Sequence, residues 1–327
     1  MMQERGASVG DYGAPLFLAW QLTNRCGARC LHCCEESGPD RGWPGELSKA
    51  ESLRLAREAA DCGIPYAAFG GGEPLSVPHV WEVFETLRRG DVSLKIETNG
   101  LPIDEAAADR LKDLGVDCIQ LSLDGPTAEW HERVRPGGDF AGVVASLERL
   151  ARRGLEPEVV FVPTRASLPH AEAVLDLAAR LGARTFVTGP MMRLGRAAQA
   201  WSSLAPSAED WRACAARLKE RARRHPGLRL SAYPWDIVEE VRVRRDSPQA
   251  MVLVVPDGKV KLLNALPFYC GDARRQSLAE AWTYVGRAWR SPEVREFTDR
   301  LLGDPALLRH ANECWPIPSL APSTLAA

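Results

Sequence analysis

The chain has 327 residues, enough for one large α/β domain and a smaller appended segment. Hydrophobic residues make up 45% of it and charged residues 26%, as in an ordinary globular protein. The formal net charge of −2 argues against a nucleic-acid or membrane-surface partner. The N-terminus lacks the apolar core of a signal peptide, and no stretch is long and apolar enough to cross a bilayer. We therefore expect a cytoplasmic protein.

Strand-like apolar runs alternate with helix-like segments along most of the chain. Strands are predicted at 16–22, 66–70, 93–98, 118–123, 158–163 and 185–189. Helices are predicted between them at 48–63, 80–90, 104–115, 140–154 and 171–182, the first opened by a capping box of Ser48 and Glu51. Repeated βα units require right-handed crossovers and a parallel sheet. These strands are too few for a closed eight-stranded barrel, so the predicted fold is an open, partial (β/α)6 barrel.

The C-terminal third is predicted to be organised differently. A helix after Ser207 closes the barrel region, and a charged linker is predicted at 239–245. A strand–turn–strand unit follows at 251–263, with Asp257-Gly258 in its turn. The expected organisation is an N-terminal extension at 1–15, a barrel at 16–235, a small α+β segment at 246–315 and a flexible tail at 316–327.

Cysteine is concentrated directly after the first predicted strand. The chain has nine cysteines, and four of them lie close together: Cys26, Cys30, Cys33 and Cys34. The CxxxCxxC spacing of the first three predicts one thiolate for each of three irons of a [4Fe-4S] cubane, with the fourth iron left open for a chelating substrate. The alternative is a tetrahedral zinc site, which needs a fourth Cys or His ligand, and Cys34 is a candidate for it.

Charged residues on the central strands are candidates for the barrel interior. Lys95, Glu97 and Asn99 share one face of the third predicted strand. A charged face on a central strand is costly unless it lines a cavity, so Lys95 and Glu97 are predicted to point inward as catalytic residues. Three arginines follow the fifth and sixth strands and are candidates to clamp a substrate anion, with solvated surface positions as the alternative: Arg165, Arg193 and Arg196.

Motifs at successive strand ends resemble those of the radical SAM superfamily. CxxxCxxC resembles its signature, and four further matches follow in order: Gly70–Pro74 (GGGEP), Thr98–Gly100 (TNG), Ser122–Gly125 (SLDG) and His131–Arg135. A single GG or DG pair is mostly turn chemistry, so the resemblance depends on the complete succession. It covers residues 16 to about 200 of the chain.

The resemblance implies two cofactors, one [4Fe-4S] cluster on Cys26, Cys30 and Cys33, and S-adenosylmethionine (SAM). The residues that it assigns to SAM are Gly71, Gly72, Glu73 and Pro74 for the amino group, Asn99 in the TNG turn, Ser122 and Asp124 for the ribose, and Arg135 for the carboxylate. An external donor such as flavodoxin or ferredoxin is expected to reduce the cluster. SAM is then cleaved to methionine and a 5′-deoxyadenosyl radical that takes a hydrogen from the substrate.

The C-terminal segment resembles the first part of a SPASM or twitch domain. The matching stretches are Val255–Gly258 and Gly271–Trp282. Such domains normally bind auxiliary clusters through many cysteines. Here the position of their first cysteine, near Leu263, is apolar, and only Cys270 and Cys314 remain, too few for a four-thiolate site. We expect the fold of such a segment without its iron.

These resemblances favour a small polar substrate. The SPASM-like branch contains peptide maturases and modifiers of sugars, aminocyclitols and nucleosides. No leader-peptide-binding domain is expected before the barrel, and the chain as a whole resembles the cytosylglucuronate decarboxylases of nucleoside antibiotic pathways. That resemblance implies non-oxidative decarboxylation of a sugar or nucleoside uronate, hence a lyase. The alternatives are a peptide (RiPP) maturase, a sugar or aminocyclitol epimerase or dehydratase, and a degenerate Fe–S partner protein without activity.

Overall fold

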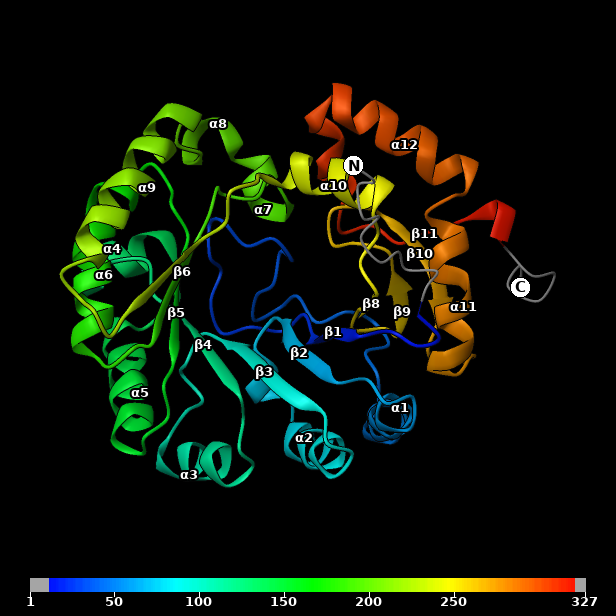
Figure 1. The fold of residues 1–327 in the computed structure, drawn as a ribbon, viewed down its shortest axis with the longest axis horizontal. Coiled ribbons are helices and arrows are strands. Elements are labelled where there is room, and N and C mark those ends of the chain that lie inside the picture. Colours follow the sequence, from blue (N-terminus) through cyan, green and yellow to red (C-terminus); the bar gives the residue numbers. More distant parts are fainter. Residues whose placement is uncertain (1–11, 321–327) are drawn as a thin grey trace, which may run out of the picture.

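One curved sheet of eleven strands runs through residues 12–320, the part of the chain that the computed structural model describes. Its order is β11-β10-β9-β8-β1-β2-β3-β4-β5-β6-β7. Strands β1 to β7 are parallel and form an incomplete barrel with helices on its outer side (Figure 1). They are β1 (Phe17–Thr23), β2 (Tyr66–Gly71), β3 (Ser93–Thr98), β4 (Cys118–Ser122), β5 (Glu158–Phe161), β6 (Thr185–Thr188) and β7 (Arg229–Ala232). The predicted parallel α/β fold is confirmed.

The outer helices pack on the apolar face of this sheet. They are α1 (Lys49–Asp61), α2 (Val80–Arg89), α3 (Glu105–Asp113), α4 (Ala128–Val134), α5 (Phe140–Arg152), α6 (Ala171–Arg180) and α9 (Ala208–Ala222). Two short helices, α7 (Gly195–Gln199) and α8 (Trp201–Leu204), precede α9. The Ser48 side chain accepts a hydrogen bond from the backbone of Glu51, which confirms the capping box. The largest buried side chains between sheet and helices are Trp20, Phe69, Phe84, Phe161 and Phe186.

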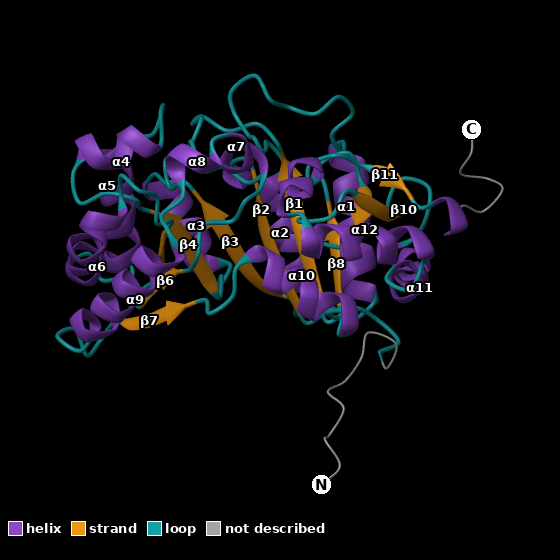
Figure 2. Ribbon diagram, turned by 90° about the horizontal axis from the view of Figure 1, so that it is seen from above, coloured by secondary structure: helices purple, strands orange, loops and turns teal. Residues whose placement is uncertain are grey.

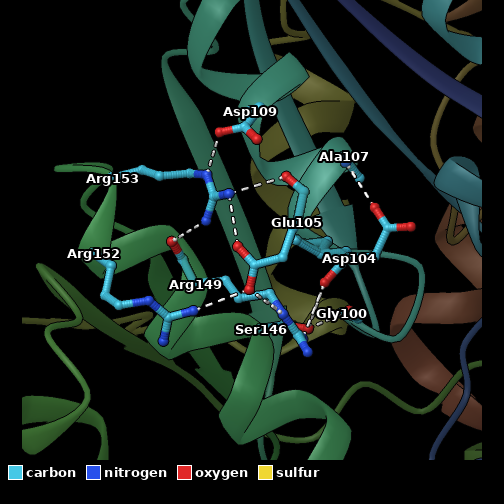
Figure 3. A network of polar contacts seen from close by, with 10 residues as sticks. Gly100, Asp104, Glu105, Ala107, Asp109, Ser146, Arg149, Arg152 and Arg153 are labelled. Carbon is cyan, nitrogen blue, oxygen red and sulfur yellow. Dashed lines mark hydrogen bonds and ion pairs between the residues drawn. The ribbon is translucent and has the colours of Figure 1, made fainter.

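Ion pairs join α3 and α5 on the outside of the barrel (Figure 3). Glu105 of α3 contacts three arginines at the C-terminal end of α5: Arg149 and Arg152 of the helix, and Arg153, which caps it. Exposed pairs of this kind each contribute at most about 1 kcal/mol. The buried hydroxyl of Ser146, also on α5, donates to the carbonyl oxygen of Gly100 at 2.7 Å. The helix pair therefore holds the turn that follows β3.

The end of the barrel and the segment after it differ from the sequence prediction in two ways. A seventh parallel strand, β7, was not expected, because its four residues Arg-Leu-Ser-Ala carry no clear alternation. The predicted charged linker lies within α10 (Ile237–Asp246), whose N-terminus is capped by Asp236. Ile237 and Val241 are buried one turn apart, and the Arg244 side chain pairs with Glu240 at 2.6 Å. The charge run is the solvated side of a helix.

The C-terminal segment continues the same sheet. It contributes β8 (Met251–Val254), β9 (Lys259–Lys261), β10 (Phe268–Asp272), β11 (Trp315–Pro316), α11 (Leu278–Ala288) and α12 (Pro292–Gly303). The predicted hairpin is present, with Gly258 at φ 87° in the turn between β8 and β9. Strand β8 pairs in parallel with β1, and Figure 2 shows the two strands side by side.

The two predicted terminal segments lie only partly inside the described residues. Within the expected flexible tail, Pro316 belongs to β11, and Ser319 donates to the carboxylate of Glu293 through both its backbone N–H and its hydroxyl. Residues 321–327 and residues 1–11 lie outside the described part. Within that part, no helix has the length and apolar character needed to cross a membrane.

Candidate active site

The three motif cysteines lie in the loop between β1 and α1, at the carboxyl edge of the parallel strands. Each sulfur accepts a hydrogen bond: Cys26 from Asn99 Nδ2 at 3.7 Å, Cys30 from Arg135 Nη1 at 3.5 Å, and Cys33 from the backbone N–H of Ser37 at 3.3 Å. The side chain of Cys34 instead packs against the hydrophobic core, and burial raises its pKa well above the usual thiol value. The three sulfurs that accept hydrogen bonds from N–H groups are therefore those of the three predicted cluster ligands.

This donor set fits three corners of a cubane. Hydrogen bonds to the sulfurs are among the features by which a protein adjusts the reduction potential of an iron–sulfur cluster. Burial raises the pKa of Cys26 and of Cys30, with the charge of Arg135 opposing the rise at Cys30. The zinc alternative needs four donors around one ion. Among the described residues, no group of three or more His, Cys, Asp or Glu side chains is arranged so that it could hold a single metal ion.

Arg196 fixes the cysteine loop. Its guanidinium donates to the carbonyl oxygens of Cys30 at 2.8 Å and Ser37 at 2.6 Å, and its backbone N–H donates to Cys33 O at 3.1 Å. The preceding Gly195 has φ 51°, and a Cβ there would overlap the carbonyl of Cys34. Arg196 was predicted to clamp a substrate anion. The structure gives it a supporting role instead, because main-chain carbonyls of the loop occupy its guanidinium.

Glycines of the GGGEP motif pack against the end of β1. Gly71 has φ 101°, and a Cβ on it would meet the carbonyl oxygen of Thr23. A Cβ on Gly72 would overlap the carbonyl of Arg25. The close backbone approach predicted for these glycines is therefore present, but between two segments of the chain. Pro74 begins a short 3₁₀ helix, Pro74–Ser76.

The carboxylate of Glu73 braces the TNG turn. It accepts hydrogen bonds from the Thr98 hydroxyl at 2.8 Å, the Asn99 backbone N–H at 2.7 Å and the Leu75 backbone N–H at 3.1 Å. Glu73 is only 2% exposed, and burial raises its pKa to about 7 against the lowering effect of these bonds. In this structure Glu73 orients Asn99, whose side chain reaches Cys26. Its predicted contact with the SAM amino group stays a prediction.

Asp124 of the SLDG motif is fully buried and anchors Arg135. Its carboxylate accepts from Arg135 Nε at 2.5 Å, from the Val162 backbone N–H at 2.7 Å and lies 3.2 Å from His32 Nε2. Burial alone would raise the pKa of Asp124, yet the charge of Arg135 and the other contacts hold it below the usual value. Burial lowers the pKa of His32 to about 4. Asp124 was predicted to bind the SAM ribose, whereas here it positions Arg135. Ser122 is half-buried at the end of β4.

Of the two charged residues predicted on the inward face of β3, Glu97 lines a cavity and Lys95 pairs with Glu97. Lys95 Nζ lies 2.8 Å from Glu97 Oε1, and Glu97 borders a cavity of about 280 Å³ between β1, β2, β3 and β8. Polar residues that the sequence analysis did not select complete its wall: Gln21, Glu35, Gln249 and Asn264. Gln21 was detectable, since it is the polar inward position of a strand that otherwise presents Phe17 and Ala19 to the cavity.

The remaining two arginines of the predicted anion clamp do not converge on this cavity. Arg165 Nε donates to the carbonyl oxygen of Ala205 at 2.8 Å. The guanidinium of Arg193 lies over the ring of Trp201, 5.6 Å from its centroid. The positions after the strands were predicted correctly, but the side chains bind neighbouring segments. In this structure Arg165, Arg193 and Arg196 form no clamp around the cavity, and their contact with a substrate anion stays a prediction.

Residues 20–164 match the family model of the Radical SAM superfamily, and this stretch contains the cysteine motif and the four motifs that follow it from Gly70 to Arg135. The chain contains a radical SAM domain. Proteins of this family use a [4Fe-4S] cluster and SAM, so the fit of the three thiols to a cubane agrees with the family's cofactors. The match to the family model ends at residue 164, just after β5, and therefore does not include β6, β7 or the C-terminal strands.

Several known proteins are similar to this chain. Mycofactocin maturase MftC of Mycobacterium ulcerans is 36% identical over 196 residues, which are 60% of this chain and 52% of that protein. The chain thus spans about half the length of this relative. AdoMet-dependent heme synthase of Methanosarcina barkeri is 27% identical over 305 residues, 86% of each chain. The structure of Streptococcus suis SuiB bound to S-adenosylmethionine aligns with a TM-score of 0.70 at 14% identity, covering 86% of this chain and 70% of SuiB. At that identity the likeness concerns the fold.

The C-terminal cysteines lie outside the radical SAM domain. Cys270 of β10 is buried in the hydrophobic core, and burial raises its pKa to about 12. The pKa of Cys314 is also raised by burial, against the charge of Lys261 nearby. Leu263, near the position of the first SPASM cysteine, is buried as well. A thiol in an apolar environment is a poor metal ligand until it is deprotonated.

We expect Cys270→Ala and Cys314→Ala each to leave the iron content unchanged at about four irons per chain, the content of one cubane. Iron and acid-labile sulfide analysis of anaerobically reconstituted protein measures this directly. Wild-type protein that reproducibly holds about eight irons, and loses half of them in either variant, would contradict it.

Proposed function

We propose that the chain is a radical SAM enzyme that removes a hydrogen atom from a peptide substrate, with an external flavodoxin- or ferredoxin-type electron donor. The observation that carries the proposal is the set of three cysteine sulfurs, each with its own N–H donor, at the carboxyl edge of the parallel strands. The bound cofactors supply electron transfer and the hydrogen-abstracting group. The chain holds two of the sulfurs through the side chains of Asn99 and Arg135.

A rim of exposed apolar side chains at the same edge supports a peptide substrate. Five of the six large hydrophobic residues exposed among those described follow the carboxyl ends of β1, β3, β6 and β7: Leu31, Leu101, Met192, Tyr233 and Trp235. Exposed aromatic and aliphatic groups beside a site are typical of surfaces that bind polypeptides. Mycofactocin maturase and SuiB, the latter also solved with its precursor peptide SuiA, point in the same direction.

The structure gives less support to a uronate substrate. A carboxylate is best bound by a guanidinium, and the three candidate arginines are occupied by main-chain carbonyls or by an aromatic ring. The charged residues that line the cavity are Glu35 and Glu97, and Lys95 pairs with Glu97. Decarboxylation, epimerisation and dehydration of a sugar substrate are therefore outcomes that the experiment below must distinguish.

Anaerobic turnover with deuterated substrates tests the proposal. One arm contains a pool of synthetic peptides deuterated along the chain, and the other contains cytosylglucuronate deuterated next to its carboxylate. We expect the peptide arm to transfer deuterium into 5′-deoxyadenosine, detected by mass spectrometry, and the uronate arm to stay at the background of a Cys30→Ala control. Transfer from the uronate with CO2 formed in step would establish decarboxylation instead. Transfer from the uronate without CO2 would indicate epimerisation or dehydration.

A further inference from the structure

Backbone hydrogen bonds place Cys30 opposite Arg135. The cysteine loop runs beside the end of α4, and two bonds fix the register: Arg29 N–H to Pro136 O at 2.7 Å and Leu31 N–H to Val134 O at 2.9 Å. The residues between these partners, Cys30 on one segment and Arg135 on the other, therefore face each other. Arg135 Nη1 lies 3.5 Å from Cys30 Sγ.

The guanidinium of Arg135 is locked in that position. Its Nε donates to Asp124 at 2.5 Å, and the side chain is 10% exposed. Asp124 is itself held by the backbone N–H of Val162 and by His32. Asp124 N–H also donates to Nδ1 of His131 at 3.2 Å, which attaches α4 to the same point. A buried network of this kind holds a donor at a fixed distance from its acceptor.

We propose that Arg135 sets the reduction potential of the cluster by donating a charge-assisted hydrogen bond to the Cys30 thiolate. The proposal rests on the cluster of the proposed function. Reduction adds negative charge to the cluster and to its sulfur ligands. A cation and an N–H donor in a water-poor site stabilise that added charge, and so make the reduced state easier to reach. Arg135 is then a positioning residue whose effect is measured on the cluster itself, a role separate from the SAM-carboxylate contact that the motif implies.

The test is an EPR-monitored redox titration of the reconstituted cluster without SAM. Arg135→Gln removes the positive charge and the planar guanidinium with its N–H donors, whereas Arg135→Lys keeps the positive charge. Arg133→Gln is the matched control, because Arg133 lies two residues away on an exposed position and stacks over Trp130 at 5.3 Å. We expect Arg135→Gln to lower the equilibrium constant for one-electron reduction about tenfold, a shift of ~59 mV to more negative potential. Arg135→Lys should shift less, and Arg133→Gln should match wild type.

A potential in Arg135→Gln equal to that of Arg133→Gln, together with weakened SAM binding, would overturn the proposal and make Arg135 a ligand of SAM alone. If Arg135→Gln assembles no cluster, the comparison passes to Arg135→Lys, which keeps the charge but loses the Nη1 donor to Cys30 and should shift to more negative potential. An unchanged potential in Arg135→Lys would then overturn the proposal equally. Failure of the proposed function is distinguishable, because it shows as wild-type protein that binds the cluster but does not cleave SAM.

Discussion

Cys30→Ala is expected to abolish both iron retention and SAM cleavage. Cys30 is 9% exposed, and its loop is held by the bonds of Arg196 and by the register with α4. Two remaining thiolates are too few to hold a cubane that needs three protein ligands. The measurement is iron content together with 5′-deoxyadenosine formed under dithionite.

Cys34→Ala is the matched control for this loss. Cys34 lies next to Cys33 in the sequence, but its side chain packs against the hydrophobic core. The variant should keep about four irons per chain and should still cleave SAM, with a modest loss of stability from the vacated space. SAM cleavage by protein in which Cys26, Cys30 and Cys33 are all replaced would contradict the assignment of the ligands.

The barrel could be predicted from the sequence because its signals are local. Six strands and their helices follow from apolar periodicity, and the Ser48 capping box marks a helix start within four residues. Strand β7 was missed because it is short and its residues are half-exposed or exposed. Helix α10 was missed because its buried stripe of Ile237 and Val241 is narrow among many charges.

The roles of the site residues were harder to predict, because they depend on contacts between distant segments. Arg196 binds the carbonyl of Cys30 across 166 positions of the sequence, and Arg135 reaches the same cysteine across 105. Position after a strand identified Arg196 as a residue of the site. Nothing in the local pattern indicated that its guanidinium binds the cysteine loop and not a substrate. The same holds for Asp124, which a motif identified and whose buried partners only the fold could reveal.

Glu73→Ala is expected to lower the free energy of unfolding by about 4 kcal/mol and the affinity for SAM by tenfold or more. The carboxylate of Glu73 satisfies three donors around the TNG turn, on Leu75, Thr98 and Asn99. Each buried donor left without a partner costs about 1–3 kcal/mol. The turn also carries the Asn99 amide that binds Cys26, so its displacement disturbs the site together with the fold. Urea unfolding and anaerobic SAM titration measure the two effects.

Glu73→Gln separates bracing of the turn from charge at this position. Burial raises the pKa of Glu73 to about 7 from the ordinary 4.5, so between these values the folded chain keeps a proton that the unfolded chain has released. The unfolding free energy of wild-type protein therefore falls as pH rises through this window, by about 3 kcal/mol for one such group. Glu73→Gln has nothing to titrate there and should lack that decrease. Its stability relative to wild type should rise from pH 4.5 to pH 7, whereas parallel stability curves would show that the carboxyl is ionised throughout. If Glu73 also accepts the SAM ammonium, Glu73→Gln should lose SAM affinity at neutral pH even where it remains folded.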